Sequence, residues 1–303
     1  MVVKWGRANV VEVSESSATV LDGRSVAEQL RGELRAESAM LTGQLGFTPV
    51  LAVLSVGEDP ASRSYVAGIR RACDRVGIAC RQIELPYSTT EAELRAEVNE
   101  LNAERMVCGV LATLPLPPHL PLATLADTLS PDKDIDGLTP TNAGRLALGW
   151  PTFAPNTPAG GIEILRRYGI TIAGKHAVVV GRSGIVGRPM AMMLLNADAT
   201  VTICHRHTAN LAEIVRTADI VVTAAGRARL ITGAMLKPGA TIIDFGINFP
   251  EWAGSKMVGD VDYASALPVA GAITPVPGGT GPVTNMMLMR NTLAAARMLL
   301  GDG

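Results

Sequence analysis

A glycine-rich turn in the second half of the chain has the residues to bind a pyrophosphate. The segment VVVGRSGIVGRP (178–189) follows an apolar run, precedes a predicted helix, and places Gly181, Gly184 and Gly187 three residues apart. Such a turn lets the backbone approach a pyrophosphate while the helix N-terminus donates amide hydrogens. Because the spacing differs from strict G-x-G-x-x-G, an ordinary strand–helix turn is the alternative.

The end of the next predicted strand favours NADP over NAD. NAD-binding units carry an Asp or Glu there, which accepts a hydrogen bond from the ribose 2′-hydroxyl. Here the strand ends in CHRHT (204–208), without an acid. Arg206, together with Arg182 in the glycine turn, has the charge and donors to bind a 2′-phosphate. A solvated loop is the alternative for Arg206, and NAD stays possible as the cofactor.

Strands and helices that would position these residues alternate in two series. Apolar runs separated by helices are typical of parallel sheets covered on both faces. The Pro- and Gly-rich stretch 113–160 separates the series, which favours two domains with a cleft over one large domain. Strands are predicted at 49–56, 78–85, 107–114, 176–181, 199–205, 219–226 and 241–246, and helices at 25–43, 61–76, 90–105 and 283–301.

Composition argues against several classes of partner. A net charge of -1 and an aromatic content of 4% give no basic or stacking surface for nucleic acid. No stretch has the apolar length of a signal peptide core or a membrane span, so we expect a soluble, cytoplasmic protein without membrane partners. The cysteines are scattered without metal-ligand spacing and are predicted to be buried thiols, with no metal site. They are Cys73, Cys80, Cys108 and Cys204.

Several segments resemble the methylenetetrahydrofolate dehydrogenase / methenyltetrahydrofolate cyclohydrolase family. The segments are GKHAVVVGRSGIVGRPMA (174–191), PDKDIDGLTPTNAGRLALG (131–149), ITPVPGGTGPVTNMM (273–287), VGEDPASRSYV (56–66), TLPLP (113–117) and TIIDFGIN (241–248). The resemblance extends from about residue 18 onward. It implies oxidation of 5,10-methylenetetrahydrofolate with NADP or NAD, usually followed by hydrolysis to 10-formyltetrahydrofolate, in a homodimer. An unrelated Rossmann oxidoreductase would not explain the motifs of the first half.

We therefore predict an α/β fold with two domains. Residues 1–158 would form a folate-binding catalytic domain, and residues 159–282 would form a Rossmann-type parallel-sheet domain that binds NADP. The C-terminal helix, 283–303, would return to the first domain.

The resemblance also implies site residues. Tyr65 would stack on the folate and Asp136 would anchor the pterin through hydrogen bonds. Without the resemblance, a rim tyrosine and a turn-capping aspartate are the better interpretations. The implied folate-binding residues also include Ser62, Pro275, Gly278 and Gly279. The implied cofactor-binding residues are Gly181, Arg182, Ser183, Ile185, Arg206, Ala225, Gly226, Ile247 and Thr284.

Two departures from the family pattern concern hydrolysis. Ile69 replaces a lysine four residues after Tyr65, and Thr113 replaces a glutamine. Spacing of i, i+4 predicts that Ile69 faces the same pocket as Tyr65. Hydride transfer needs only positioning, whereas hydrolysis must move protons. We predict that the dehydrogenase is kept and the cyclohydrolase is weak or absent. A fully bifunctional enzyme and a non-catalytic folate- and NADP-binding relative are the alternatives.

Two smaller departures remain. Asn156 stands where the family usually has a cysteine, and the sequence offers no interpretation of it. Arg206 stands where a serine is usual, which keeps a phosphate-binding group in place.

Overall fold

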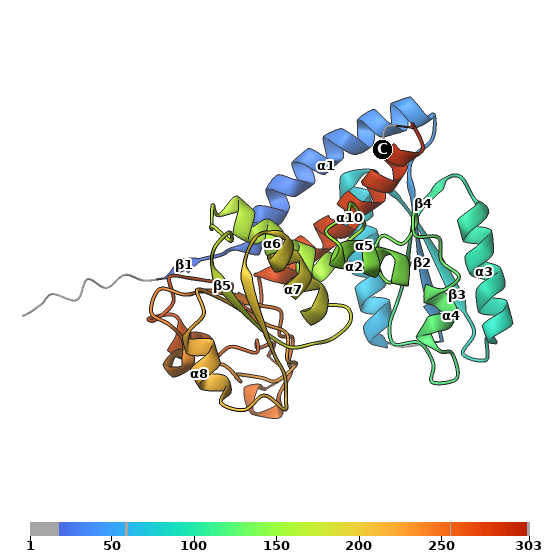
Figure 1. The fold of residues 1–303 in the computed structure, drawn as a ribbon. Helices are drawn as coiled ribbons and strands as arrows, with labels where there is room; N and C mark the ends of the chain where they lie inside the picture. The colour runs from blue at the N-terminus through green and yellow to red at the C-terminus, as the bar shows by residue number, and fades with distance from the viewer. Residues whose placement is uncertain (1–17, 58–59, 255, 302–303) are drawn as a thin grey trace, which may run out of the picture.

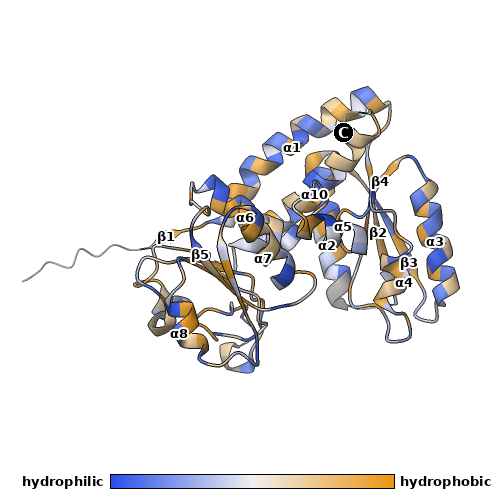
Figure 2. Cartoon of the chain, in the orientation of Figure 1, coloured by the Kyte–Doolittle hydropathy of each residue, from blue (hydrophilic) through white to orange (hydrophobic). Residues whose placement is uncertain are grey.

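The computed structural model describes residues 18–57, 60–254 and 256–301, which form two α/β units, each around a parallel sheet (Figure 1). This confirms the predicted two-domain α/β fold. Hydrophobic and hydrophilic residues share helices such as α1 and α3 (Figure 2), so that each presents an apolar face to its sheet or neighbours.

The first unit has a three-stranded sheet in which β2 lies between β3 and β4, all parallel. Residues 51–54 of the central strand are buried, as expected for an apolar run covered on both faces. Helix α3 begins at a capping box, since Thr90 and Glu93 satisfy each other's backbone N–H groups. The elements are α1 (Gly23–Leu45), β2 (Val50–Val56), α2 (Pro60–Val76), β3 (Ala79–Leu85), α3 (Glu91–Ala103), β4 (Val107–Ala112), α4 (Leu122–Ala126) and α5 (Pro140–Ala147).

The second unit has a six-stranded parallel sheet in the order β1-β9-β8-β7-β5-β6. The four strands predicted for this half are present. Strand β1 (Thr19–Val20) pairs with β9, so these two residues of the predicted first domain join the second sheet. The other elements are α6 (Asn156–Arg167), β5 (His176–Val180), α7 (Gly187–Asn196), β6 (Thr200–Cys204), α8 (Leu211–Arg216), β7 (Ile220–Thr223), η1 (Gly233–Met235), β8 (Thr241–Asp244), η2 (Glu251–Ala253), α9 (Tyr263–Ala266) and β9 (Ala272–Ile273).

The closing helix, α10 (Thr280–Met298), returns to the first unit as predicted (Figure 1). It packs on α1, α2, α6 and β4. Buried side chains of these helices, such as Leu30, Ile164 and Leu288, belong to one hydrophobic cluster that also reaches Val179 of the second sheet. The two units therefore share part of their core.

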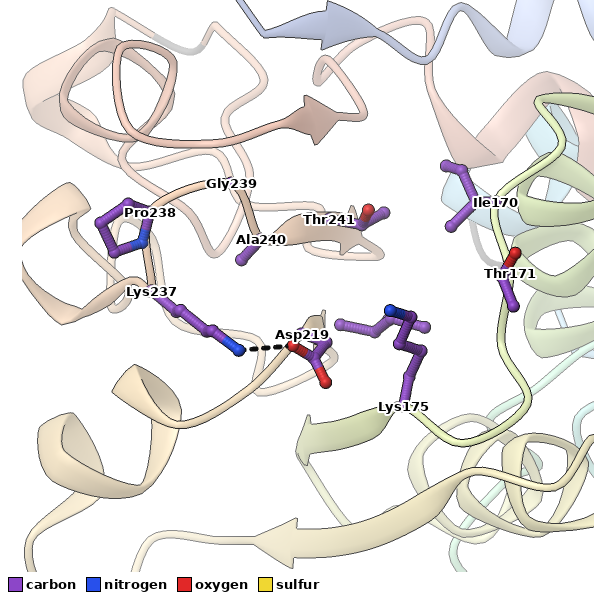
Figure 3. A pocket seen from close by; sticks show the side chains of 10 residues that line it. Ile170, Thr171, Lys175, Asp219, Lys237, Pro238, Gly239, Ala240 and Thr241 are labelled. Carbon is purple, nitrogen blue, oxygen red and sulfur yellow. Dashed lines mark hydrogen bonds and ion pairs between the residues drawn. The ribbon is translucent and has the colours of Figure 1, made fainter.

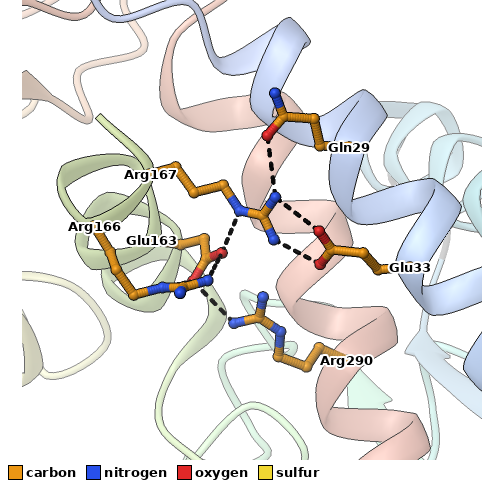
Figure 4. Close-up of polar contacts among 6 residues, drawn as sticks. All are labelled: Gln29, Glu33, Glu163, Arg166, Arg167 and Arg290. Carbon is orange, nitrogen blue, oxygen red and sulfur yellow. Dashed lines mark hydrogen bonds and ion pairs between the residues drawn. The ribbon is translucent and has the colours of Figure 1, made fainter. Parts of the chain in front are cut away.

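A buried carboxylate joins three helices at this junction (Figure 4). The side chain of Glu163 on α6 is 5% exposed and accepts hydrogen bonds from Arg166, Arg167 and Arg290 at 2.6–3.1 Å. Burial alone would raise the pKa of Glu163, but these three arginines hold it well below its usual range. Arg167 also pairs with Glu33 of α1 at 2.6 Å. The cluster thus connects α1, α6 and α10.

The sequence predicts four buried thiols, and the structure buries three of them fully. The four thiols are free; Cys73, Cys108 and Cys204 are buried and Cys80 is partly buried. Among the described residues, no cluster of His, Cys, Asp and Glu is arranged to hold a metal ion. No helix in the described ranges is both long and apolar enough to span a bilayer.

Candidate active site

The glycine turn after β5 requires two of its three glycines. Gly181 has φ 139°, and a Cβ there would lie 2.2 Å from the carbonyl oxygen of Ala224. A Cβ on Gly187 would lie 2.3 Å from the carbonyl oxygen of Gly181. Gly184 has open space around its Cβ position. The turn is therefore held close to the end of β7, the neighbouring strand in the sheet, and Gly184 lies on its open side.

Ser183 shapes the entry into α7. Its hydroxyl accepts hydrogen bonds from the backbone N–H groups of Val186 and Gly187, each at 3.2 Å. Side-chain acceptors of this kind satisfy amides at a helix start that have no partner within the helix. In this structure the hydroxyl of Ser183 thus stabilises the turn.

A pocket of about 470 Å³ lies at the carboxyl ends of β5, β6 and β7. Strand β5 is flanked by β6 on one side and β7 on the other, so the chain reverses its direction across the sheet at this point. Ligands of open α/β sheets bind at such reversals. The pocket brings together five of the predicted cofactor residues: Gly181, Arg182, Ser183, Arg206 and Ala225.

Arg227, which the sequence analysis missed, also lines this pocket. It directly follows the predicted residues Ala225 and Gly226, so a basic residue just past the strand end was the available signal. Buried Asp260 accepts hydrogen bonds from the backbone N–H groups of all three residues, at 2.6, 3.0 and 2.9 Å. A single carboxylate therefore fixes the loop that carries Arg227.

A second buried carboxylate supports the loop after β8. Asp244 accepts hydrogen bonds from the Thr223 hydroxyl at 2.8 Å and from the backbone N–H of Gly246 at 2.7 Å. Burial raises the pKa of Asp244 to about 6, although these hydrogen bonds oppose the shift. The carbonyl of Asp244 also accepts a hydrogen bond from Thr280 at 3.2 Å, which links this loop to α10.

Four predicted cofactor residues do not line the 470 Å³ pocket, and one of them, Gly226, lies between two residues that do, Ala225 and Arg227. Ile185 and Ile247 are 48% and 62% exposed, and Thr284 lies on α10 beside Gly160. Ile185 lies within the glycine turn, Ile247 follows the end of β8, and Thr284 follows the first turn of α10.

Tyr65 and Asp136 both belong to the first unit, close enough for the charge of Asp136 to act on the Tyr65 hydroxyl. Asp136 accepts hydrogen bonds from the side chain of Asn156 at 2.7 Å and from its backbone N–H at 3.2 Å. Burial raises the pKa of Asp136, and the hydrogen bonds from Asn156 act in the opposite direction. Burial and the negative charge of Asp136 raise the pKa of Tyr65 to about 12. Ser62 is in the same helix, α2, but its side chain lies outside the described residues.

Asn156 binds the Asp136 carboxylate, and Asn291 in turn binds Asn156. The side-chain amide of Asn291 on α10 donates to Asn156 Oδ1 at 3.1 Å and to the carbonyl of Ile135 at 2.9 Å. Asn156 is the residue that stands in place of the family cysteine, and the structure gives it a role that the sequence did not reveal. Its amide orients the Asp136 carboxylate.

The two altered family positions hold no titratable group. Ile69 has no exposed surface and belongs to the hydrophobic core together with Ile135, so it faces the interior of the unit. Tyr65, one turn earlier, is 46% exposed. Thr113 is buried and its hydroxyl donates to Ser55 Oγ at 3.1 Å.

The loop between β9 and α10 packs tightly on the start of α1. A Cβ on Gly279 would lie 2.6 Å from the carbonyl oxygen of Pro275, and one on Gly23 would lie 1.7 Å from that of Gly279. Gly278 has φ 108° and lies beside the guanidinium of Arg24. The predicted folate-binding loop 275–279 therefore contacts α1 through residues that cannot carry larger side chains.

A further hollow of about 320 Å³ lies at the opposite edge of the large sheet (Figure 3). Lys175, Asp219 and Thr241 line it just before or at the start of β5, β7 and β8, and Lys237 pairs with Asp219 at 2.6 Å. Nucleotide sites form at the carboxyl ends of parallel strands, whereas this hollow lies at their amino ends. It is therefore not a candidate for the cofactor site.

Comparison with known proteins gives matches over both units. Residues 21–136 match the model of the tetrahydrofolate dehydrogenase/cyclohydrolase catalytic domain, and residues 155–300 match that of the tetrahydrofolate dehydrogenase/cyclohydrolase NAD(P)-binding domain.

Individual relatives are similar over nearly their whole length. The chain is 56% identical over 285 residues to the bifunctional protein FolD of Chloroflexus aurantiacus, covering 94% of this chain and 99% of the relative. The crystal structure of the bifunctional enzyme FolD from Campylobacter jejuni aligns with a TM-score of 0.91 at 41% identity, covering 93% and 100% of the two chains. The Trypanosoma brucei FolD, solved with NADP and an inhibitor, aligns with a TM-score of 0.88 at 40% identity, covering 94% and 99%.

Proposed function

Because the chain belongs to the tetrahydrofolate dehydrogenase/cyclohydrolase family, we propose that it oxidises 5,10-methylenetetrahydrofolate to the methenyl form by hydride transfer to NADP. We further propose that its cyclohydrolase step is weak or absent. The observation that carries the proposal is the Asp136–Tyr65 pair in the same chain as an arginine-lined pocket at the strand ends.

The residues at the strand ends fit an NADP molecule. Gly181 and Gly187 keep the turn free of side chains that would block a pyrophosphate. Arg182, Arg206 and Arg227 would bind the 2′-phosphate through charge-assisted hydrogen bonds. Bound NADP would supply the hydride acceptor. Without an acid in this pocket to bind a free 2′-hydroxyl, NAD is the less favoured cofactor.

On the folate side the protein would bind and orient. Asp136 would accept hydrogen bonds from the pterin amino and ring N–H groups, with its carboxylate held by Asn156. Because the pKa of Tyr65 is about 12, its hydroxyl stays protonated at neutral pH and acts as a donor beside the stacked ring. The folate nitrogens stabilise the cation that hydride loss leaves, so this step needs no protein acid or base.

Hydrolysis has greater needs. Water must add to the methenyl carbon and lose a proton. A side chain that accepts this proton typically raises the rate by about 10²–10⁴-fold. Ile69 and Thr113 provide no such group, and Ile69 is fully buried. Relatives that carry the name bifunctional favour a second candidate, in which other residues of this chain move the proton.

One pair of assays tests the proposal. With purified protein, NADPH formation from methylenetetrahydrofolate should be readily measured, while hydrolysis of methenyltetrahydrofolate should stay near the uncatalysed rate. Rapid hydrolysis would favour the bifunctional candidate, and binding of both ligands without turnover would favour a non-catalytic relative.

A pair of double variants locates the cause. Ile69→Lys with Thr113→Gln should raise hydrolysis, whereas Ile69→Met with Thr113→Gln, which is of similar size but has no amine, should not. If the two double variants fold and hydrolyse equally, these positions do not explain the missing step.

The NADP preference is tested by comparing kcat/KM for NADP and NAD. The homodimer and the cytoplasmic location stay predictions, and light scattering of the purified chain measures the former.

A further inference from the structure

Two side-chain amides connect α10 to the Asp136 carboxylate. Asn291 Nδ2 donates to Asn156 Oδ1 at 3.1 Å, and Asn156 Nδ2 donates to Asp136 Oδ1 at 2.7 Å. Asn156 is the first residue of α6 and is 3% exposed. The two asparagines are 135 positions apart in the sequence, so they meet only because α10 packs on α6 (Figure 1).

The acceptors around these amides allow one orientation of each. Asn291 Nδ2 also donates to the carbonyl oxygen of Ile135 at 2.9 Å and to that of Ala154 at 3.2 Å. Asn156 Nδ2 also donates to the carbonyl oxygen of Ile135, at 3.2 Å. Carbonyl and carboxylate oxygens only accept hydrogen bonds, so turning either amide over would set two oxygens against each other. The backbone carbonyls therefore fix Asn291, and Asn291 fixes Asn156.

The orientation of Asn156 decides what the Asp136 carboxylate meets. With Nδ2 toward it, Asp136 accepts a side-chain N–H in addition to the backbone N–H of Asn156 at 3.2 Å. With the amide turned over, Asn156 Oδ1 would face a carboxylate oxygen and repel it. Burial raises the pKa of Asp136 and the two donors of Asn156 lower it, so the turned amide would favour the protonated acid. A protonated Asp136 accepts fewer hydrogen bonds from a ligand.

We propose that Asn291 is a positioning residue for folate binding: it fixes the amide of Asn156 and so presents Asp136 to the pterin as a hydrogen-bonded carboxylate. The inference rests on the proposed function, in which Asp136 binds the pterin. Asn291 acts through Asn156 and not by touching the substrate. The family's usual cysteine at position 156 would not need this help, because the single hydrogen of a thiol turns toward its acceptor without a second residue to orient it.

Two other titratable groups face Asp136. The negative charge of Asp134 raises the pKa of Asp136, and the charge of Asp136 in turn raises that of Tyr65 on α2. Tyr65 keeps its proton at neutral pH, because its pKa is about 12. Asp134 is buried and accepts backbone N–H groups of its own loop, from Leu138 and Thr139, at 2.8 Å each. A change of pH profile on replacing Asn291 would therefore report on Asp136.

The test is a double-mutant cycle on the KM for methylenetetrahydrofolate. Asn291→Leu removes the orienting amide, keeps the size of the side chain, and should raise this KM about tenfold at neutral pH without changing the KM for NADP. In the Asn156→Cys background the same change should raise the KM less than about twofold, because a thiol needs no orienting. Equal losses in the two backgrounds would mean that Asn291 only supports the packing of α10, and would overturn the proposal.

The pH dependence of the same KM is a readout that packing alone would not move. Because Asp136 binds as a carboxylate, affinity for the folate is lost as the pH falls through the pKa of Asp136. In Asn291→Leu this loss should begin about one pH unit higher than in the wild-type chain, the shift that corresponds to a tenfold effect. Asn99→Leu, the same substitution at an exposed position of α3, should leave the KM and its pH profile unchanged. Identical profiles of Asn291→Leu and the wild-type chain would contradict the proposal.

Oxidation of methylenetetrahydrofolate with NADP by the wild-type chain separates this inference from the proposed function. Absence of that oxidation would refute the proposed function, whereas normal oxidation that Asn291→Leu does not alter would refute the positioning role alone. Thermal unfolding shows whether the variants fold. If Asn291→Leu does not fold, Asn291→Ala removes the same amide without adding bulk and should give the same rise in KM and the same change of pH profile.

Discussion

The two proposed ligand-binding regions of this chain, a nucleotide region at the strand ends and a folate region around Tyr65 and Asp136, differ in where their polar groups lie. The pocket at the strand ends is lined by Arg182, Arg206 and Arg227, and the buried carboxylate of Asp260 fixes the loop that carries Arg227. In the region of Tyr65 and Asp136, the residue one helical turn after Tyr65 is Ile69, which lies in the apolar core.

The difference matches the needs of the two reactions considered in the proposed function. Hydride transfer requires that two rings be held in reactive contact, which needs binding groups only. Hydrolysis requires a proton acceptor at the carbon that water attacks. Under the proposed function, Asp136 and the arginine-lined pocket supply the binding groups, whereas Ile69 and Thr113 supply no proton acceptor.

The largest effect is expected where the two regions join. Glu163→Gln leaves the arginines of α6 and α10 without their counter-charge and should lower the free energy of unfolding by about 3 kcal/mol at neutral pH. Because the pKa of Glu163 is lowered in the folded state, its contribution is present above pH about 4.5 and is lost as the pH falls below that value. The variant should therefore lose less stability on acidification than the wild-type chain.

Urea unfolding at pH 7 and at pH 4 measures both effects. Asp219→Asn, which removes a more exposed ion pair with Lys237, serves as control and should cost less than about 1 kcal/mol at pH 7. Similar costs for the two variants at pH 7 would show that the junction cluster has no special role.

The nucleotide region is most sensitive at its glycines. Gly187→Ala would place a Cβ 2.3 Å from the carbonyl oxygen of Gly181, so the turn must move by about 1 Å, a displacement that can cost about 100-fold in activity. Gly184→Ala meets open space and should keep the wild-type Tm. Steady-state kinetics measure the activity, and fluorescence titration with NADP and thermal unfolding measure the affinity and the Tm. Undiminished activity and NADP affinity in Gly187→Ala would contradict the role of the turn.

The folate region is tested at its carboxylate. Asp136→Asn should lower kcat/KM for methylenetetrahydrofolate about 30-fold, the equivalent of one lost charge-assisted pair of hydrogen bonds, and leave the KM for NADP unchanged. Asp132→Asn changes an exposed residue of the same loop and is the control. An equal effect of Asp136→Asn on both substrates would mean that the two regions are not separate.

The smallest effect concerns cofactor choice. Arg227→Gln should raise the KM for NADP about tenfold, because it removes one of three cations from the pocket, with little change for NAD. Arg188→Gln removes an exposed charge outside that pocket and should change neither KM. Steady-state kinetics with both cofactors measure this, and an equal loss for NADP and NAD would exclude a role in binding the 2′-phosphate.

The sequence by itself determined the fold class, the family, the positions of the main strands along the chain and the position of the glycine turn. These follow from local patterns: apolar runs of strand length, helical spacing and glycines at a strand–helix junction. The i, i+4 spacing alone could not predict how differently Ile69 and Tyr65 are exposed. Four residues on a helix advance about 40° beyond one full turn, and at the edge of a buried face this suffices to place Ile69 in the core while Tyr65 stays partly exposed.

Only the tertiary structure decided which distant residues meet. It paired β1 with β9 and brought Asn291 of α10 to Asn156. It also placed the Asp260 carboxylate under the loop that carries Arg227. Such contacts join residues up to about 250 positions apart and arise from the packing of whole helices and strands, so no spacing within one segment announces them.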